Sequence, residues 1–88
     1  MSYPNWPRRR AIPEKPKSIS GKRMVRFLQR QGWWVERIHG SHHILHSERY
    51  PDVTLTVAVH GRKTMSTKAI VATLKAASVS NEEFNREA

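Results

Sequence analysis

The sequence contains no cysteine among its 88 residues. This absence excludes a disulfide framework and a thiolate zinc site as sources of stability. Long apolar runs are also missing, and the charged N-terminal residues are not followed by a hydrophobic stretch. We therefore expect neither secretion nor a membrane partner, and predict a cytoplasmic protein. A chain of this length is expected to form one domain with a modest core.

Acidic residues are scarce. Seven Asp and Glu stand against sixteen Lys and Arg, which gives a formal net charge of +9. Such a field attracts polyanions, of which nucleic acid is the most common, although an acidic protein or membrane surface would respond to it as well. Residues 18–78 carry ten basic and three acidic side chains, a balance of +7. Most of the positive field therefore belongs to the predicted domain.

Residues 1–17 hold four of the five prolines and the run Arg8-Arg9-Arg10. Proline at this density removes backbone donors and disfavours helices and ladders, so we predict a basic, disordered arm. The arm could contact phosphates or be a solvated tail. Residues 18–88 are predicted to form the single domain.

The first helix is predicted to begin at Ser20, whose hydroxyl can cap the free N–H groups. Met24, Phe27 and Leu28 then recur at helical spacing and form an apolar stripe. Gly32 can adopt the left-handed conformation that ends a helix. A helix with one face in the core follows.

Three strands are predicted next, at residues 33–39, 42–46 and 53–59. The third has the clearest alternation, because every second residue from Val53 to Val59 is apolar. The Gly40-Ser41 turn and a short loop join the strands, which predicts an antiparallel meander.

The second helix is predicted to start at Ser66 or Thr67, with Ile70, Leu74 and Ala77 as its buried stripe. A capping box formed by Ser80 and the glutamate three residues later then opens a short C-terminal helix. The predicted fold is α+β: an α-β-β-β-α sandwich in which helices cover one face of a three-stranded antiparallel sheet. The other face is open to solvent or to a partner.

All five histidines lie between His39 and His60. Adjacent His42 and His43 should point to opposite faces of a strand. His42 and His46 share a face but lie ~13 Å apart along a strand. We therefore expect no metal site, and no small-molecule cofactor is indicated.

RNA cleavage needs no metal, because the ribose 2′-hydroxyl is a nucleophile beside the phosphate. The protein must then supply proton transfer and charge stabilisation. Histidine can accept or donate a proton near neutral pH, and Arg or Lys can balance charge on the phosphate. The residue inventory permits this chemistry but does not by itself select it.

Several motifs resemble those of the HicA toxin family. They are Gly32-Trp33, the run from Arg37 to Ile44 that contains Gly40-Ser41-His42-His43, the segment from Thr56 to Gly61, and the segment from Ser80 to Phe84. The resemblance spans Ser20 to Phe84. This chain has Ala58 where family members usually carry proline, and Lys68-Ala69 where a Gly-Thr pair is common.

The resemblance implies a fold like a double-stranded RNA-binding domain and the activity of an mRNA interferase, a toxin that cleaves mRNA and is neutralised by a HicB-type antitoxin. It also implies that His42 is the catalytic histidine and that His43 has no equivalent role. Gly40 and Ser41 would form the turn that positions His42. The candidate RNA contacts, chosen for charge and placement, are Lys22, Arg26, Arg30, Arg37, Lys63 and His60.

Two alternatives need no catalytic histidine. A non-catalytic RNA-binding module would use the same fold to recognise duplex shape and 2′-hydroxyls. A partner-binding protein would instead dock an acidic protein on the open sheet face or on the arm.

Overall fold

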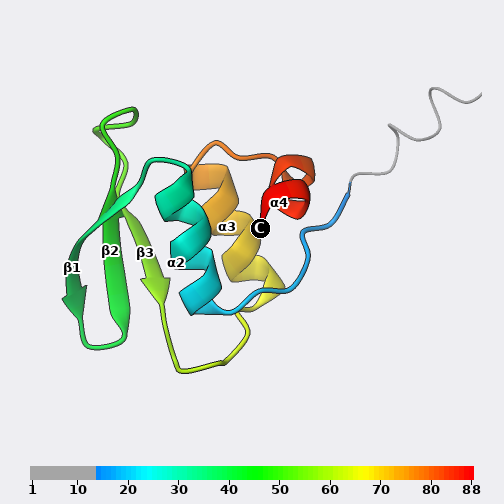
Figure 1. Cartoon of the computed structure of the whole chain (residues 1–88), viewed down its shortest axis with the longest axis horizontal. Helices are drawn as coiled ribbons and strands as arrows, with labels where there is room; N and C mark the ends of the chain where they lie inside the picture. Colours follow the sequence, from blue (N-terminus) through cyan, green and yellow to red (C-terminus); the bar gives the residue numbers. More distant parts are fainter. Residues whose placement is uncertain (1–13) are drawn as a thin grey trace, which may run out of the picture.

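The structure, a computed structural model, describes residues 14–88. Figure 1 shows a sheet at one end of the molecule, two helices packed against it, and a short helix beyond them. Along the chain the elements are α2 (Gly21–Arg30), β1 (Trp34–His39), β2 (His42–His46), β3 (Leu55–Ala58), α3 (Thr67–Ala76) and α4 (Asn81–Glu87). This order confirms the predicted α+β fold and is consistent with a fold like a double-stranded RNA-binding domain.

Serine hydroxyls cap all three helices. The Oγ atoms of Ser20, Ser66 and Ser80 each accept a hydrogen bond from the backbone N–H three residues later, at 3.2, 3.1 and 3.0 Å. Each bond satisfies one of the donors that a helix leaves free at its N-terminus. The predicted helix starts are therefore confirmed.

The end of α2 explains why β1 starts one residue later than predicted. Gly32 has φ = 101°, and the N–H of Trp33 donates to Leu28 O at 3.0 Å. This is the 6→1 bond of a Schellman motif, in which glycine takes the left-handed position. Trp33 therefore belongs to the helix cap, and its side chain is buried in the core.

The sheet is antiparallel with strand order β1-β2-β3. β3 is shorter than the predicted strand at residues 53–59, because the N–H of Val53 donates to Tyr50 O in a turn. The pairing of β1 with β2 shifts register between Val35 and Arg37. Alternation along the sequence does not reveal such a bulge, because the extra residue is defined by the partner strand.

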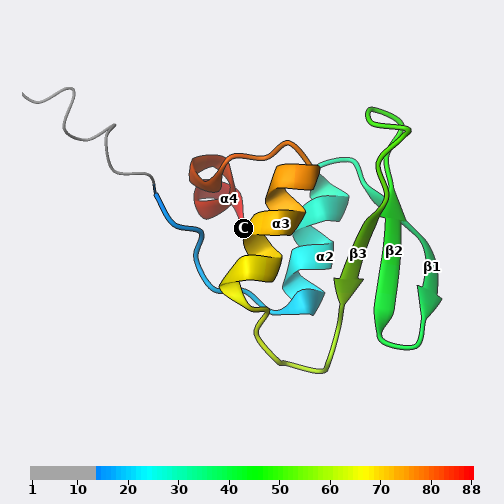
Figure 2. The ribbon, with the colours of Figure 1, turned by 180° about the vertical axis from the view of Figure 1, so that it is seen from behind.

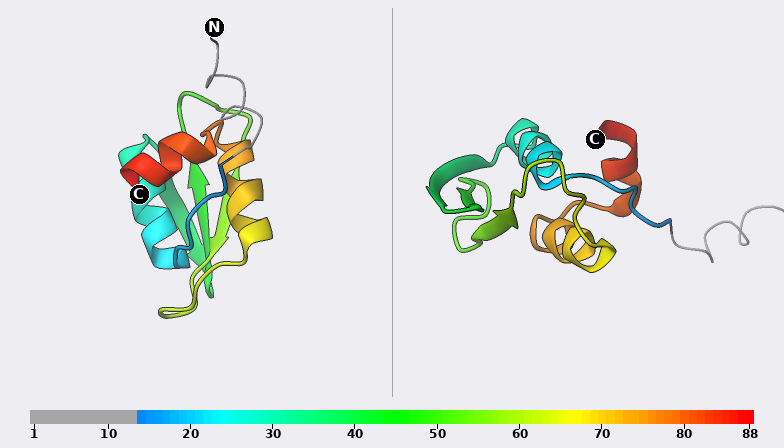
Figure 3. Two further views of the ribbon diagram at one scale, coloured as in Figure 1. Left: turned by 90° about the vertical axis from the view of Figure 1, so that its right-hand side faces the viewer. Right: turned by 90° about the horizontal axis from the view of Figure 1, so that it is seen from below.

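The core lies between α2, α3 and one face of the sheet. Figure 3 shows the two helices side by side over that face. The predicted helical stripes are buried here, and they meet Leu45 of β2 together with Leu55 and Val57 of β3. Phe84 of α4 is fully buried and meets the Phe27 ring edge to face, with centroids 5.1 Å apart.

The chain segment before α2 runs beside α4 (Figure 2). Asn81 and Asn85 donate side-chain hydrogen bonds to the carbonyls of Glu14 and Lys15 at 2.8 and 2.7 Å. Lys17 Nζ donates to Ala88 O at 3.1 Å. Residues 14–17 are thus hydrogen-bonded to the C-terminal helix and to Ala88. The rest of the predicted arm, residues 1–13, lies outside the described residues.

Candidate active site

β2 separates its side chains between the two faces of the sheet. His43 and Leu45 pair with Val57 and Leu55, which are buried against the helices. Because side chains alternate along a strand, His42 lies on the opposite, open face. The expectation that the adjacent histidines point to opposite faces is therefore confirmed.

An open pocket of about 640 Å³ lies where the open face meets α3. His42, Thr56 and Ala58 form its sheet side, and Ala69, Ala72 and Thr73 of α3 form the opposite wall. The loop between β3 and α3 supplies the remaining lining residues, His60, Lys63, Thr64, Met65 and Ser66. The pocket brings together three of the predicted site residues, namely His42, His60 and Lys63.

Backbone hydrogen bonds fix the ends of this pocket. Gly40, at φ = 62°, and Ser41 form the turn before β2, and Ser41 O accepts a 2.8 Å bond from the N–H of Val59. The loop then reverses at a second turn, where the N–H of Lys63 donates to His60 O at 2.9 Å. His42 follows Ser41 and His60 follows Val59, so the hydrogen bond between Ser41 and Val59 links the backbone next to both histidines of the pocket.

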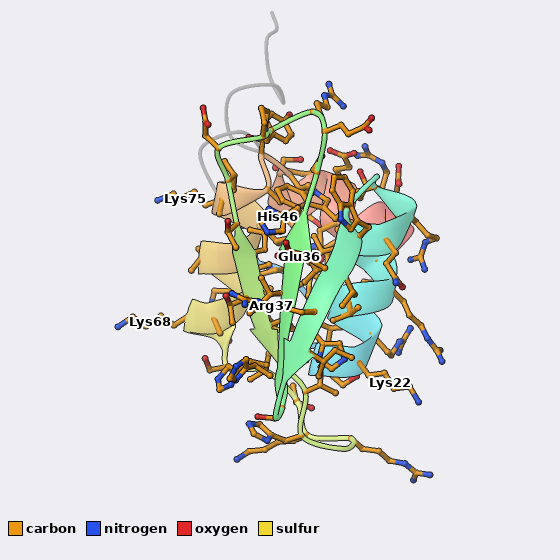
Figure 4. The ribbon with its side chains drawn as sticks, turned by 90° about the vertical axis from the view of Figure 1, so that its left-hand side faces the viewer. Lys22, Glu36, Arg37, His46, Lys68 and Lys75 are labelled. Atoms are coloured by element: carbon orange, nitrogen blue, oxygen red, sulfur yellow. The ribbon has the colours of Figure 1, made fainter. Side chains whose placement is uncertain are left out.

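The open face continues over β1, as Figure 4 shows. Arg37 pairs with Ile44 of β2 and lies on this face. His46 Nε2 forms a 2.8 Å hydrogen bond with Glu36 Oε1 at the bulge. His46 is thus held by a carboxylate at the opposite end of β2 from His42.

The model of a known protein family matches residues 21–79, more than half of the chain. Its description reads "HicA toxin of bacterial toxin-antitoxin". The chain belongs to the HicA toxin family. Comparison with curated proteins and with solved structures found no match.

Membership makes the chain a toxin of the toxin–antitoxin type, and HicA toxins are ribonucleases. The matched residues contain the whole sheet, α2, α3 and every residue that lines the pocket. Helix α4 and the segment fastened to it lie outside the match. The match therefore covers the residues that build the pocket and its scaffold.

Basic residues of α2 lie apart from the pocket of this HicA toxin. Lys22 and Arg26 line a groove on the other side of the sheet, together with His43. Figure 4 shows Lys22 projecting at the edge of the molecule opposite α3. Arg30 lies near the C-terminal end of α4, where its Nη2 donates a hydrogen bond to Glu87 O at 3.0 Å. The structure thus divides the candidate RNA contacts among several surfaces.

His43 has an unusual environment on the helix side of the sheet. Its Nδ1 atom is buried and has no hydrogen-bond partner. A buried polar atom without a partner usually costs stability. Burial of this atom distinguishes His43 from exposed His42 and fits its lack of an expected catalytic role.

The α3 wall of the pocket was not predicted. Ala69, Ala72 and Thr73 stand at i, i+3 and i+4, so they share one face of the helix. Their small side chains leave the space that the pocket occupies. That spacing is visible in the sequence, but only the fold shows that the same face looks toward His42.

Within residues 14–88, no group of three or more histidines and carboxylates is placed to hold a metal ion. In the same part of the chain, no helix is long and apolar enough to cross a membrane.

Proposed function

We propose that this HicA toxin is a metal-independent endoribonuclease that cleaves mRNA in the cytoplasm and is neutralised by a HicB-type antitoxin. The observation that carries the proposal is the pocket on the open face of the sheet. It exposes His42 beside His60 and Lys63 and is wide enough to admit part of a nucleotide. Family membership gives the toxin class, and the residues that line the pocket support the proposed chemistry.

His42 is the proposed general acid or base. Cleavage begins when the ribose 2′-oxygen attacks the adjacent phosphorus, and a side chain must remove its proton or protonate the departing 5′-oxygen. Exposed His42 can reach a phosphate that enters the pocket. The turn at Gly40 and Ser41 sets its position, because Ser41 is hydrogen-bonded to the backbone of Val59.

The cations of the open face are the proposed contacts to the scissile phosphate. Lys63 lines the pocket, and Arg37 lies on the neighbouring strand. Their charges would offset the negative charge that develops on the phosphate oxygens. Lys22 and Arg26 would contact phosphates farther along the RNA. Arg30 donates one hydrogen bond to the carbonyl of Glu87 and could contact a phosphate through its remaining N–H donors.

A HicB-type antitoxin is the proposed protein partner. A protein that covers the open face would exclude RNA from the pocket without altering the catalytic residues. The chain's net charge of +9 favours an acidic surface on that partner.

The deciding experiment is cleavage of a defined mRNA, with EDTA present, by the wild-type protein and by His42→Ala. Since general acid–base catalysis contributes about 10²–10⁴-fold, we expect at least a 100-fold loss in the variant. His46→Ala is the matched control, because His46 lies on the same strand and face but outside the pocket. It should retain most of the activity.

Two results would count against the proposal. Equal cleavage by wild type and His42→Ala would remove His42 from the mechanism. If neither protein cuts RNA but both bind it equally, the chain is a non-catalytic RNA-binding module.

A further inference from the structure

We propose that His60 is the second proton-transfer group of the active site and works as a complementary pair with His42. The inference rests on the proposed ribonuclease function. A single histidine can serve only as base or as acid in one displacement, so the second role needs another group. His60 is the other histidine of the pocket.

The register of the sheet places His60 diagonally across from His42. His42 pairs with Ala58, and the 2.8 Å bond from Val59 N to Ser41 O continues the same pairing by one residue. His60 is the next residue, two positions beyond the end of β3, and it lines the same pocket as His42. Diagonal neighbours on adjacent strands lie about 7–8 Å apart, within reach of long side chains. A phosphate between the two rings could be contacted by both.

The surroundings of the pair leave it free to exchange protons with a substrate. The other charged or titratable side chains of the elements around the pair are Glu36, Arg37 and His39 on β1, His43 and His46 on β2, Arg62 and Lys63 on the loop, and Lys68 and Lys75 on α3. Of these, only Lys63 lines the pocket, and Figure 4 shows Lys68 and Lys75 projecting away from the sheet. No carboxylate is among the described residues that line the pocket, so neither ring is held there by an acidic partner.

The proposed reaction is an internal transesterification. One imidazole takes the proton of the 2′-hydroxyl as the bond from the 2′-oxygen to phosphorus forms. The other, protonated imidazole gives its proton to the 5′-oxygen as the bond from phosphorus to that oxygen breaks. The products are a 2′,3′-cyclic phosphate and a free 5′-hydroxyl, and no oxidant, reductant or metal is consumed.

The first test is the pH dependence of kcat/KM for cleavage of a short RNA that contains a mapped cut site. An acid and a base together give the wild type a bell-shaped profile. His60→Ala should lose about 10²–10⁴-fold at the optimum and one limb of the bell. His39→Ala is the matched control, because His39 is the cross-strand neighbour of His42 but does not line the pocket. It should keep both limbs.

The second test separates proton transfer from phosphate binding. The same RNA is made with sulfur in place of the bridging 5′-oxygen at the cut site, because a thiolate leaves without being protonated. The variant that lacks the acid should then recover most of its rate, and the variant that lacks the base should not. We therefore expect recovery in exactly one of His42→Ala and His60→Ala.

His60→Gln completes the set, because it can still donate a hydrogen bond to phosphate but cannot transfer a proton. The inference is overturned if this variant keeps wild-type activity, if His60→Ala keeps both limbs, or if neither alanine variant recovers on the sulfur substrate. Absence of cleavage by the wild-type protein would instead overturn the proposed function itself. The melting temperature of each variant is measured to exclude misfolding. Because His60 is exposed, we expect its variants to melt at the temperature of the wild type.

Discussion

At the scale of single residues, Gly21 shows how closely the helix layer approaches the sheet. It is the first residue of α2 and is buried. A Cβ atom built on it would collide with the carbonyl oxygen of Ala58 in β3. The carbonyl belongs to the backbone, and the backbone fixes the position of a Cβ atom, so neither can move aside as the end of a flexible side chain would. The absence of a side chain at this position therefore sets the distance between α2 and β3.

Gly21→Ala should destabilise the fold by about 1–3 kcal/mol, the usual cost of overpacking a well-packed site. The measurement is the urea midpoint of unfolding followed by circular dichroism. Lys22→Ala changes the next residue of the same helix, which is exposed, and should stay within about 0.5 kcal/mol of the wild type. If the two variants unfold at the same midpoint, the contact with Ala58 does not limit the packing.

Individual histidines illustrate what the sequence reveals at this scale. Alternation along β2 predicts that His42 and His43 face opposite ways, and they do. It does not predict the hydrogen bond between His46 and Glu36, because that contact depends on the bulge in the neighbouring strand. Nor does it predict the unpartnered Nδ1 of His43, which results from packing on the helix side of the sheet.

At the scale of elements, α4 contributes a single buried aromatic ring to the core. Phe84 is the one buried residue of this seven-residue helix, and its ring packs against Phe27 of α2. An isolated helix this short is not stable in water. Contacts with the rest of the molecule therefore stabilise α4, and the Phe84 ring is the buried one among them.

Phe84→Ala should cost about 3–5 kcal/mol, because it removes a fully buried aromatic ring and leaves a cavity. The quantity to measure is the free energy of unfolding in urea. Val71→Ala on α3 truncates an exposed apolar side chain and serves as the comparison. A loss below about 1 kcal/mol for Phe84→Ala would mean that α4 contributes little to the fold.

Helix starts that depend on residues close in the sequence were predictable. Strand ends and surfaces that depend on contacts between distant residues were not. Ser20, Ser66 and Ser80 cap helices through bonds that span three residues, so the sequence contains both partners of each bond. The length of β3 depends instead on a turn made by the preceding loop. The pocket depends on how α3 stands against the sheet. The resemblance to the HicA family could therefore point to His42 as a candidate, whereas the surface that surrounds His42 is set by the fold.

At the scale of the whole molecule, the formal charge of +9 makes any RNA contact sensitive to salt. Binding to single-stranded RNA should weaken linearly in a plot of log affinity against log salt concentration, with a slope of about −0.7 for each phosphate neutralised. RNA with 2′-O-methyl groups suits the measurement because it cannot be cut. Affinities at several potassium chloride concentrations give the slope.

Lys63→Ala should make this slope shallower by about 0.7, because Lys63 lines the pocket and is a proposed phosphate contact. Lys75→Ala removes the same charge from α3 on a side chain that projects away from the sheet (Figure 4), so its slope should match the wild type. Equal slopes for the two variants would mean that RNA responds to the total charge and not to the pocket.

The fastening of residues 14–17 to α4 determines where the molecule can be modified. Figure 2 shows Ala88 and the segment before α2 at the end of the molecule remote from β1 and β2. The contact at Ala88 uses its carbonyl oxygen, an atom that persists as a peptide carbonyl if the chain is extended. A fluorophore or affinity tag attached after Ala88 would therefore report on the protein while leaving the pocket accessible.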